Sequence, residues 1–122
     1  MCSVLMSIKP KYAHRIMTGE KKYEFRKKAC KRKVDKILIY STVPDQRVVG
    51  EAEVECVLID SPAKLWKKTE KAAGIEKDLY DHYFENMDSA VAYKIGNVVK
   101  YKTPKTLLEI GVKVAPQSFQ YI

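Results

Sequence analysis

The chain has 122 residues, of which 46% are hydrophobic and 31% are charged, and its formal net charge is +8. This mixture is typical of a soluble globular domain and excludes disordered, fibrous and membrane-spanning classes of protein. The length predicts one domain over residues 1–122. Because the start of the chain lacks the pattern of a secretory leader, we expect a cytoplasmic protein without membrane contact.

Strand and helix patterns follow one another irregularly along the chain. Alternation of apolar and polar residues predicts strands over residues 2–8, 21–26, 36–42, 48–59, 89–95, 98–102 and 107–114, with a tight turn at residues 96–97. Helices are predicted from Pro10 to Gly19, from Ser61 to a break at Ala73, and over about residues 76–86. This order predicts an α+β, mainly β fold, a small and partly closed antiparallel β-barrel with about three short helices around it.

The cysteines and histidines form no metal-binding pattern. Cys2, Cys30 and Cys56 are far apart, and neither a Cys-x-x-Cys pair nor two histidines at ligand spacing accompanies them. We therefore expect free thiols, with Cys56 packed in the core. No metal and no cofactor are predicted.

Basic residues are concentrated in one part of the chain. Residues 9–36 hold 12 Lys and Arg against three Asp and Glu, a net charge of +9, whereas the rest of the chain sums to −1. A concentrated basic surface attracts phosphate backbones through counterion release. The predicted phosphate contacts are the cations of one loop, Lys27, Lys28, Lys31, Arg32 and Lys33. The alternative is a solvated loop that only keeps the protein soluble.

Three charged residues follow Gly19 closely. On a strand, Glu24 and Arg26 point to the same face, about 7 Å apart, and Lys21 joins them only if the strand begins after it. Such a group either neutralises itself or binds a ligand, because Lys and Arg bind phosphates and carbonyls and Glu accepts from amino groups. Spacing alone favours the structural role.

The segment Gly19-Glu20-Lys21-Lys22-Tyr23-Glu24-Phe25-Arg26 matches the Gly-x-Lys-x-x-Glu-x-Arg signature of ASCH domains, a branch of the PUA-like superfamily. Residues 7–13, 39–44, 49–52 and 116–121 resemble the family in the same order. The resemblance implies a small β-barrel with helices around a cleft, motif residues lining that cleft, and RNA as the partner.

The predicted ligand-binding residues come from the motif and two neighbouring segments, and they are Lys9, Gly19, Lys21, Glu24, Arg26, Tyr40, Ser41 and Thr42. Base stacking needs an exposed aromatic ring, for which the candidates are Tyr12, Tyr40, Tyr93 and Tyr121.

The family also includes members that resemble amidohydrolases of an acylated cytidine. These members have a threonine at the position of Glu24, and they use a later glutamate, for which Glu70 and Glu76 are both candidates. A carboxylate can activate water as a general base, but it does not form the same acyl intermediate. The departure at Glu24 therefore argues against that activity.

Three functions remain open. The first is a module that binds RNA or a nucleotide in the motif cleft. The alternative is a hydrolase acting on a modified nucleoside or RNA, an amidohydrolase or ribonuclease, with Lys21 and Glu24 as catalytic residues. The third is a protein-interaction or coactivator module in which the motif only stabilises the barrel. We favour the first, because the charge asymmetry supports it independently of the family.

Overall fold

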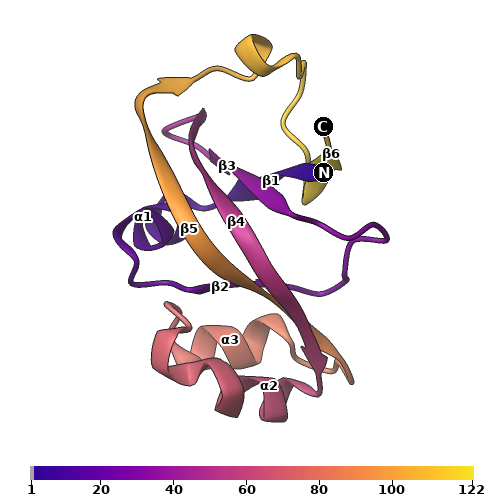
Figure 1. Cartoon of the computed structure of the whole chain (residues 1–122). Helices are drawn as coiled ribbons and strands as arrows, with labels where there is room; N and C mark the ends of the chain where they lie inside the picture. Colours follow the sequence, from indigo (N-terminus) through magenta and orange to yellow (C-terminus); the bar gives the residue numbers. More distant parts are fainter. Residues whose placement is uncertain (1) are drawn as a thin grey trace.

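The computed structural model describes residues 2–122, which form a curved six-stranded sheet and its flanking helices (Figure 1). The strands are β1 (Ser3–Ile8), β2 (Tyr23–Arg26), β3 (Lys36–Ser41), β4 (Arg47–Asp60), β5 (Ala90–Lys105) and β6 (Phe119–Tyr121). The α-helices are α1 (Pro10–Thr18), α2 (Pro62–Thr69) and α3 (Lys77–Tyr83), and short 3-10 helices lie at Glu70–Ala72 and Leu108–Ile110.

The strand order is β2-β5-β4-β3-β1-β6, so β2 and β6 are the edges of the sheet. The long strands β4 and β5 run side by side across the molecule (Figure 1), and register shifts between them bend the sheet into a half-barrel. The predicted α+β, mainly β, partly closed barrel with three short helices is confirmed. One pair, β1 with β3, is parallel, because the chain crosses over through α1 and β2 before it returns.

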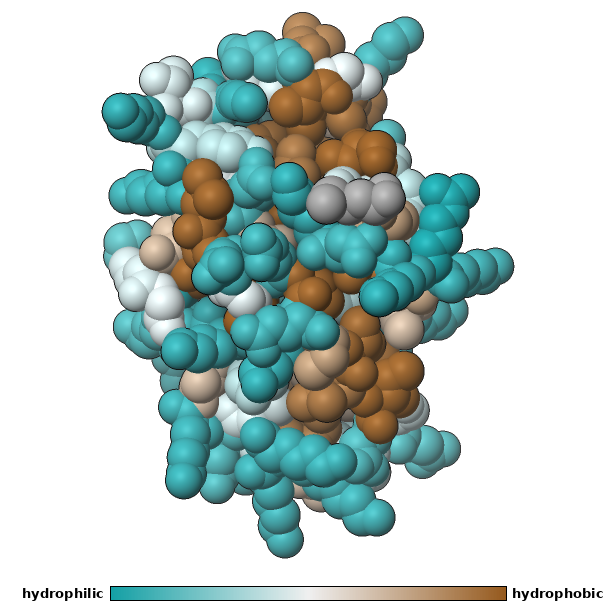
Figure 2. Space-filling view, in the orientation of Figure 1, coloured by the Kyte–Doolittle hydropathy of each residue, from teal (hydrophilic) through white to brown (hydrophobic). Residues whose placement is uncertain are grey.

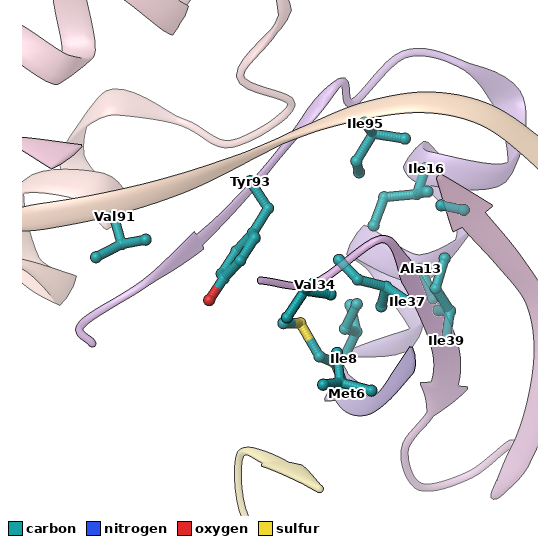
Figure 3. Packing of buried hydrophobic residues seen from close by; sticks show 12 residues of the cluster. Met6, Ile8, Ala13, Ile16, Val34, Ile37, Ile39, Val91, Tyr93 and Ile95 are labelled. Carbon is teal, nitrogen blue, oxygen red and sulfur yellow. The ribbon is translucent and has the colours of Figure 1, made fainter. Parts of the chain in front are cut away.

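Helix α1 has the predicted start and end. Pro10 is its first residue, and Gly19 follows its last residue with φ at 85° and its N–H donating to the carbonyl of Ile16. Figure 3 shows the core cluster that holds the helix, which contains Val4, Met6, Ile8, Ala13, Ile16, Val34, Ile37, Ile39, Ala52, Val91, Tyr93 and Ile95. This packing fixes the end of α1 relative to β1 and β5.

Helices α2 and α3 lie together beyond one end of the sheet (Figure 1). Their aromatic side chains pack against β2, with the ring of Phe25 centred 5.1 Å from that of Tyr80 and 6.3 Å from that of Phe84. The ring of Trp66 is centred 4.7 Å from that of Tyr80, so this partly buried side chain packs against the same cluster. This second cluster fixes α3 against the strand that carries the motif.

Three local predictions are wrong. Strand β5 continues through residues 96–97 without a hairpin turn, because β4 is long enough to pair along it and Gly96 lies at a register shift. The segment 107–114 contains a 3-10 helix that Gly111 ends with φ at 80°, and residues 119–121, for which no strand was predicted, form β6. Cys56 is exposed, because a register shift next to it interrupts the alternation of buried and exposed positions in β4.

Candidate functional site

A cleft of about 310 Å³ lies between α1, α3 and the ends of β1 and β2. Its lining combines charged, aromatic and aliphatic side chains, namely Ser7, Ile8, Lys9, Tyr12, Lys21, Glu24, Phe25, Arg26, Ile75, Leu79, His82 and Tyr83. This volume is at the lower end of small-molecule sites, so the cleft suits one small group.

The structure brings the charged motif residues Lys21, Glu24 and Arg26 to this one cleft. Strand β2 begins only at Tyr23, so Lys21 lies in the preceding turn and is free of the strand's alternation. The backbone N–H of Lys21 donates to the carbonyl of Arg15 at 2.9 Å, which fixes this turn against α1. The turn therefore decides the direction of Lys21 that the sequence left open.

The side chain of Lys21 is buried, with only 3% of the residue's surface exposed. Its Nζ donates to the carbonyl of Ala73 at 2.8 Å and lies 4.8 Å from the centre of the Phe25 ring and 5.5 Å from that of Tyr12. Loss of hydration lowers the pKa of Lys21 from 10.5 to about 8, while the carboxylate of Glu24 opposes that change. Lys21 is thus a buried ammonium that loses its charge close to the physiological pH range.

Glu24 and Arg26 form an ion pair at the floor of the cleft. The distance from Arg26 Nη2 to Glu24 Oε2 is 2.9 Å, and the two side chains are 11% and 9% exposed. Arg26 also donates from Nη2 to the carbonyl of Ser7 at 3.0 Å and from Nη1 to the hydroxyl of Ser118 at 3.1 Å. Its Nε is buried and has no acceptor among residues 2–122.

These contacts give Arg26 a structural role. Arg26 ends the edge strand β2, whereas Ser7 belongs to β1 and Ser118 precedes the other edge strand, β6. The guanidinium therefore bridges the two sides of the open barrel. Ser118 did not stand out in the sequence, because its contact joins segments 92 positions apart.

Helix α3 and the segment before it supply a wall of the cleft that the sequence did not predict. Ile75, Leu79 and Tyr83 form a stripe with a spacing of four residues, with Ile75 just before α3, and all three line the cleft; Leu79 is 43% exposed. A neighbouring stripe, Tyr80 and Phe84, packs in the core. One core contact buries one apolar stripe of so short a helix. The second apolar stripe beside it was therefore the signal in the sequence for this wall of the cleft.

Two further predicted ligand-binding residues are Lys9 and Gly19, of which only Lys9 lines the cleft. Lys9 is exposed and lines the rim directly before α1. Gly19 does not line the cleft, and its positive φ serves the turn that leads to Lys21.

Tyr40, Ser41 and Thr42 are not among the residues that line the cleft. Tyr40 is buried with Leu5 in a separate core cluster, because successive residues of β3 point to opposite faces of the sheet. The hydroxyl of Ser41 is occupied by a 2.8 Å hydrogen bond to the carboxylate of Asp45. The prediction that this strand end contributes to the cleft is therefore wrong.

The five cations predicted to contact phosphates lie in the loop between β2 and β3, which we call the basic loop (residues 27–35). Lys27, Lys28, Lys31, Arg32 and Lys33 are all exposed, and no ion pair within residues 2–122 involves them. The loop projects from the body of the sheet in Figure 1, and Figure 2 shows hydrophilic side chains projecting from that side.

Two tyrosine hydroxyls hold the backbone of the basic loop. The N–H of Cys30 donates to Tyr93 at 2.8 Å, and the N–H of Arg32 donates to Tyr121 at 3.2 Å. The guanidinium of Arg32 also lies 4.4 Å from the centre of the Tyr121 ring. At the other end, the ammonium of Lys27 lies 5.0 Å from the ring of Tyr83, which lines the cleft, so loop and cleft adjoin.

Two further findings concern the part of the chain that the structure describes. It contains no group of three or more His, Cys, Asp and Glu side chains that could hold a metal ion. Over the same residues, no helix has both the length and the apolar character needed to cross a membrane.

The sequence matches the family model of the ASCH domain over residues 6–99. The chain belongs to the ASCH domain family. The crystal structure of ASCH from Zymomonas mobilis has a TM-score of 0.91 to this chain at 27% sequence identity, covering 98% of this chain and 87% of that one. The half-barrel is therefore the PUA-like fold of ASCH domains.

Two relatives similar in sequence are longer than this chain. The large ribosomal subunit protein uL22 of Ureaplasma parvum serovar 3 is 36% identical over 121 residues, which are 98% of this chain and 39% of that protein. The ASCH domain-containing ribonuclease of Zymomonas mobilis is 30% identical over 90 residues, which are 73% of this chain and 61% of that protein. The chain spans less than two thirds of the length of either relative.

Proposed function

We propose that this ASCH domain binds RNA or a nucleotide, with one base in the cleft and the phosphates on the basic loop. The observation that supports this most is the convergence of Lys21, Glu24 and aromatic rings in a single cleft that adjoins five exposed cations, none of which has an ion-pair partner among the described residues 2–122. Charge draws the polyanion to the loop, and the cleft then holds one unit of it.

The cleft offers complementary groups to the edge and face of a nucleobase. The ammonium of Lys21 donates to a carbonyl or ring nitrogen, and Glu24 accepts from an amino group or ring N–H. The rings of Tyr12 and Tyr83 offer apolar faces. A cleft of about 310 Å³ does not admit a paired and stacked base, so we expect the bound nucleotide to be unpaired.

Phosphate contacts are assigned to Lys9 and the basic loop in this proposal. Both terminal nitrogens of Arg26 already have acceptors in Ser7, Glu24 and Ser118, whereas Lys9 is exposed at the rim. A phosphate at Arg26 would have to displace contacts that close the barrel, so Arg26 is assigned to the structure of the cleft.

The binding proposal is tested by the affinity of a short single-stranded RNA, measured by fluorescence anisotropy. We expect Lys21→Met, which removes the charge and keeps the length of the side chain, to weaken binding about tenfold or more. The matched control is Lys67→Met at an exposed position of α2, for which we expect wild-type affinity. If Lys21→Met and Arg26→Ala both keep wild-type affinity and salt dependence, the cleft is not the binder and a protein-interaction role takes its place.

A hydrolase is the second candidate, and the pKa of Lys21 near 8 is the observation that favours it. An amine with that pKa exchanges a proton readily near neutral pH, and Glu24 lies in the same cleft to assist a water or hydroxyl nucleophile. The similarity to a protein named as a ribonuclease makes RNA the first substrate to try. Neither Glu70 nor Glu76 lines the cleft, so a second carboxylate is not supplied from there.

The two candidates differ in turnover. Purified protein is incubated with single-stranded RNA and, separately, with an acylated nucleoside, and products are sought by mass spectrometry. Product that disappears in both Lys21→Met and Glu24→Gln supports the hydrolase. Binding without product in the wild-type chain supports the binding module.

A further inference from the structure

The stem of Lys21 passes directly over the backbone of Gly74, which is 53 positions further along the chain. Gly74 has φ at 65°, and a Cβ built on it would lie only 2.7 Å from the Cα of Lys21 and within the volume of its Cβ and Cγ. Neither backbone nor stem can yield easily there, because Lys21 is bonded through its own N–H to α1. Gly74 is thus required both by its φ and by this close approach.

The neighbours of Gly74 complete a support around the amine. The carbonyl of Ala73 is the acceptor of Lys21 Nζ at 2.8 Å, and the carbonyl of Ala72 accepts from the N–H of Lys22 at 2.9 Å. Ala73 is itself buried, with 1% of its surface exposed. Backbone groups therefore hold Lys21 at both ends of its side chain.

The supporting segment is tied to α1 by a second set of contacts. Arg15 donates from Nη1 to the carbonyl of Gly74 at 2.9 Å and from Nη2 to the carboxylate of Glu76 at 3.2 Å. Lys11 pairs with the same carboxylate at 3.3 Å. The hydrogen bond from Arg15 lowers the pKa of Glu76 to about 2, so this carboxylate stays ionised. Residues 73–76 are thus clamped between α1 and the cleft.

We infer that Ala73 and Gly74 are positioning residues that hold the Lys21 amine dehydrated and directed at the cleft. The inference rests on the proposed function, because it gives Ala73 and Gly74 the role of positioning the Lys21 amine that contacts the ligand. The contacts alone support its structural part, namely that Ala73 and Gly74 keep the Lys21 amine dehydrated. This part predicts the pKa of Lys21 in the protein without ligand. The charged groups around the amine are Glu24 and Arg26 on β2, Arg15 on α1, and Glu76 before α3.

Gly74→Ala is the variant that tests the inference, with Gly111→Ala as its matched control. Both glycines have positive φ, at 65° and 80°, so both substitutions strain the backbone, but a Cβ at Gly111 meets nothing within 4 Å. The pKa of Lys21 is measured by NMR from the chemical shift of its 13Cε as a function of pH. We expect Gly74→Ala to displace the stem, hydrate the amine and raise the pKa from about 8 toward 10.5, while Gly111→Ala leaves it unchanged.

Arg15→Lys provides a second test if Gly74→Ala does not fold. It keeps the positive charge near Lys21 and loses the two-pronged contact with Gly74 and Glu76, so we expect a smaller rise of the same pKa. An unchanged pKa of Lys21 in a folded Gly74→Ala, or in Arg15→Lys where that variant alone folds, overturns the inference. Affinity for single-stranded RNA is measured on the same samples. If the pKa rises while the affinity stays at the wild-type value, the positioning role stands and the proposed function fails.

Discussion

The charged motif residues of the cleft and the cations of the basic loop come from one basic stretch of sequence, yet their charges are in opposite environments. In the cleft, Lys21, Glu24 and Arg26 are largely buried, and each has a hydrogen-bonding or ionic partner. In the basic loop the five cations are exposed and none has an ion-pair partner within residues 2–122, while two tyrosine hydroxyls hold the loop backbone. Net charge alone therefore does not identify the residues that recognise a ligand: the loop supplies attraction, and the cleft supplies shape and hydrogen bonds.

The cleft and the basic loop are expected to differ most in how much the loss of one cation lowers the free energy of unfolding. Arg26→Met leaves the carboxylate of Glu24 buried without its cation and opens the bridge to Ser7 and Ser118, so we expect a loss of about 3 kcal/mol or more in the free energy of unfolding. Lys31→Met in the basic loop is the control and should change it by less than about 0.5 kcal/mol. Urea unfolding of the wild-type chain and the two variants measures these changes. Equal losses of stability in the two variants would contradict the difference between cleft and loop cations.

The second effect is a dependence of stability on pH that belongs to Lys21. Because its pKa is about 8 in the folded chain and 10.5 otherwise, the unfolded chain binds more protons between these values. The cost of burying the ammonium is present in full below pH 8 and is relieved as the pH rises toward 10.5. Relative to Lys21→Met, the wild-type chain should gain on the order of 3 kcal/mol over this window. A constant difference between the two chains would contradict the burial of this amine.

The third effect separates attraction from recognition. Replacing Lys27, Lys28 and Lys31 with Gln should reduce the slope of log affinity against log salt by about 2 for a single-stranded RNA. The control replaces Lys64, Lys67 and Lys71, which are equally exposed but lie on α2 and the following 3-10 helix. Equal slopes in the two triple variants would show that the loop is only a solvated surface.

The smallest effect concerns the hold on the loop backbone. Tyr121→Phe removes the acceptor of the Arg32 N–H and leaves the bond from the Cys30 N–H to Tyr93 intact. We expect the amide of Arg32 to exchange its hydrogen several-fold faster, with the amide of Cys30 unchanged, as measured by NMR. Faster exchange at both amides would mean that the loop is held as a whole rather than at two separate points.

Much of the fold follows from local sequence signals. Pro10 and Gly19 mark the ends of α1, and Gly50 marks an irregularity in β4 next to a close approach of Val99. The signals fail where distant segments decide the structure. Gly96 reads as a turn, but the length of β4 keeps β5 extended through it.

The cleft was predictable only in part for the same reason. The motif places Lys21, Glu24 and Arg26 within a few residues, and strand alternation directs Glu24 and Arg26 to one side, but the direction of Lys21 depends on the turn before β2. The partners of these residues, Ala73 and Ser118, are 52 and 92 positions away, and no periodicity indicates such contacts. Tyr40 was misassigned because successive residues of a strand point to opposite faces of the sheet. Its side chain packs in a separate core cluster and does not line the cleft.

A methyl NMR titration of the labelled protein with a short single-stranded RNA tests most directly whether the cleft holds the RNA. Ile8, Ile75 and Leu79 line the cleft, whereas Ile59 and Val99 are exposed elsewhere and serve as internal controls. If the RNA occupies the cleft, the methyl groups of the three cleft residues shift saturably and those of the two controls stay unchanged. Saturable RNA binding that leaves Ile8, Ile75 and Leu79 unshifted would contradict binding in the cleft.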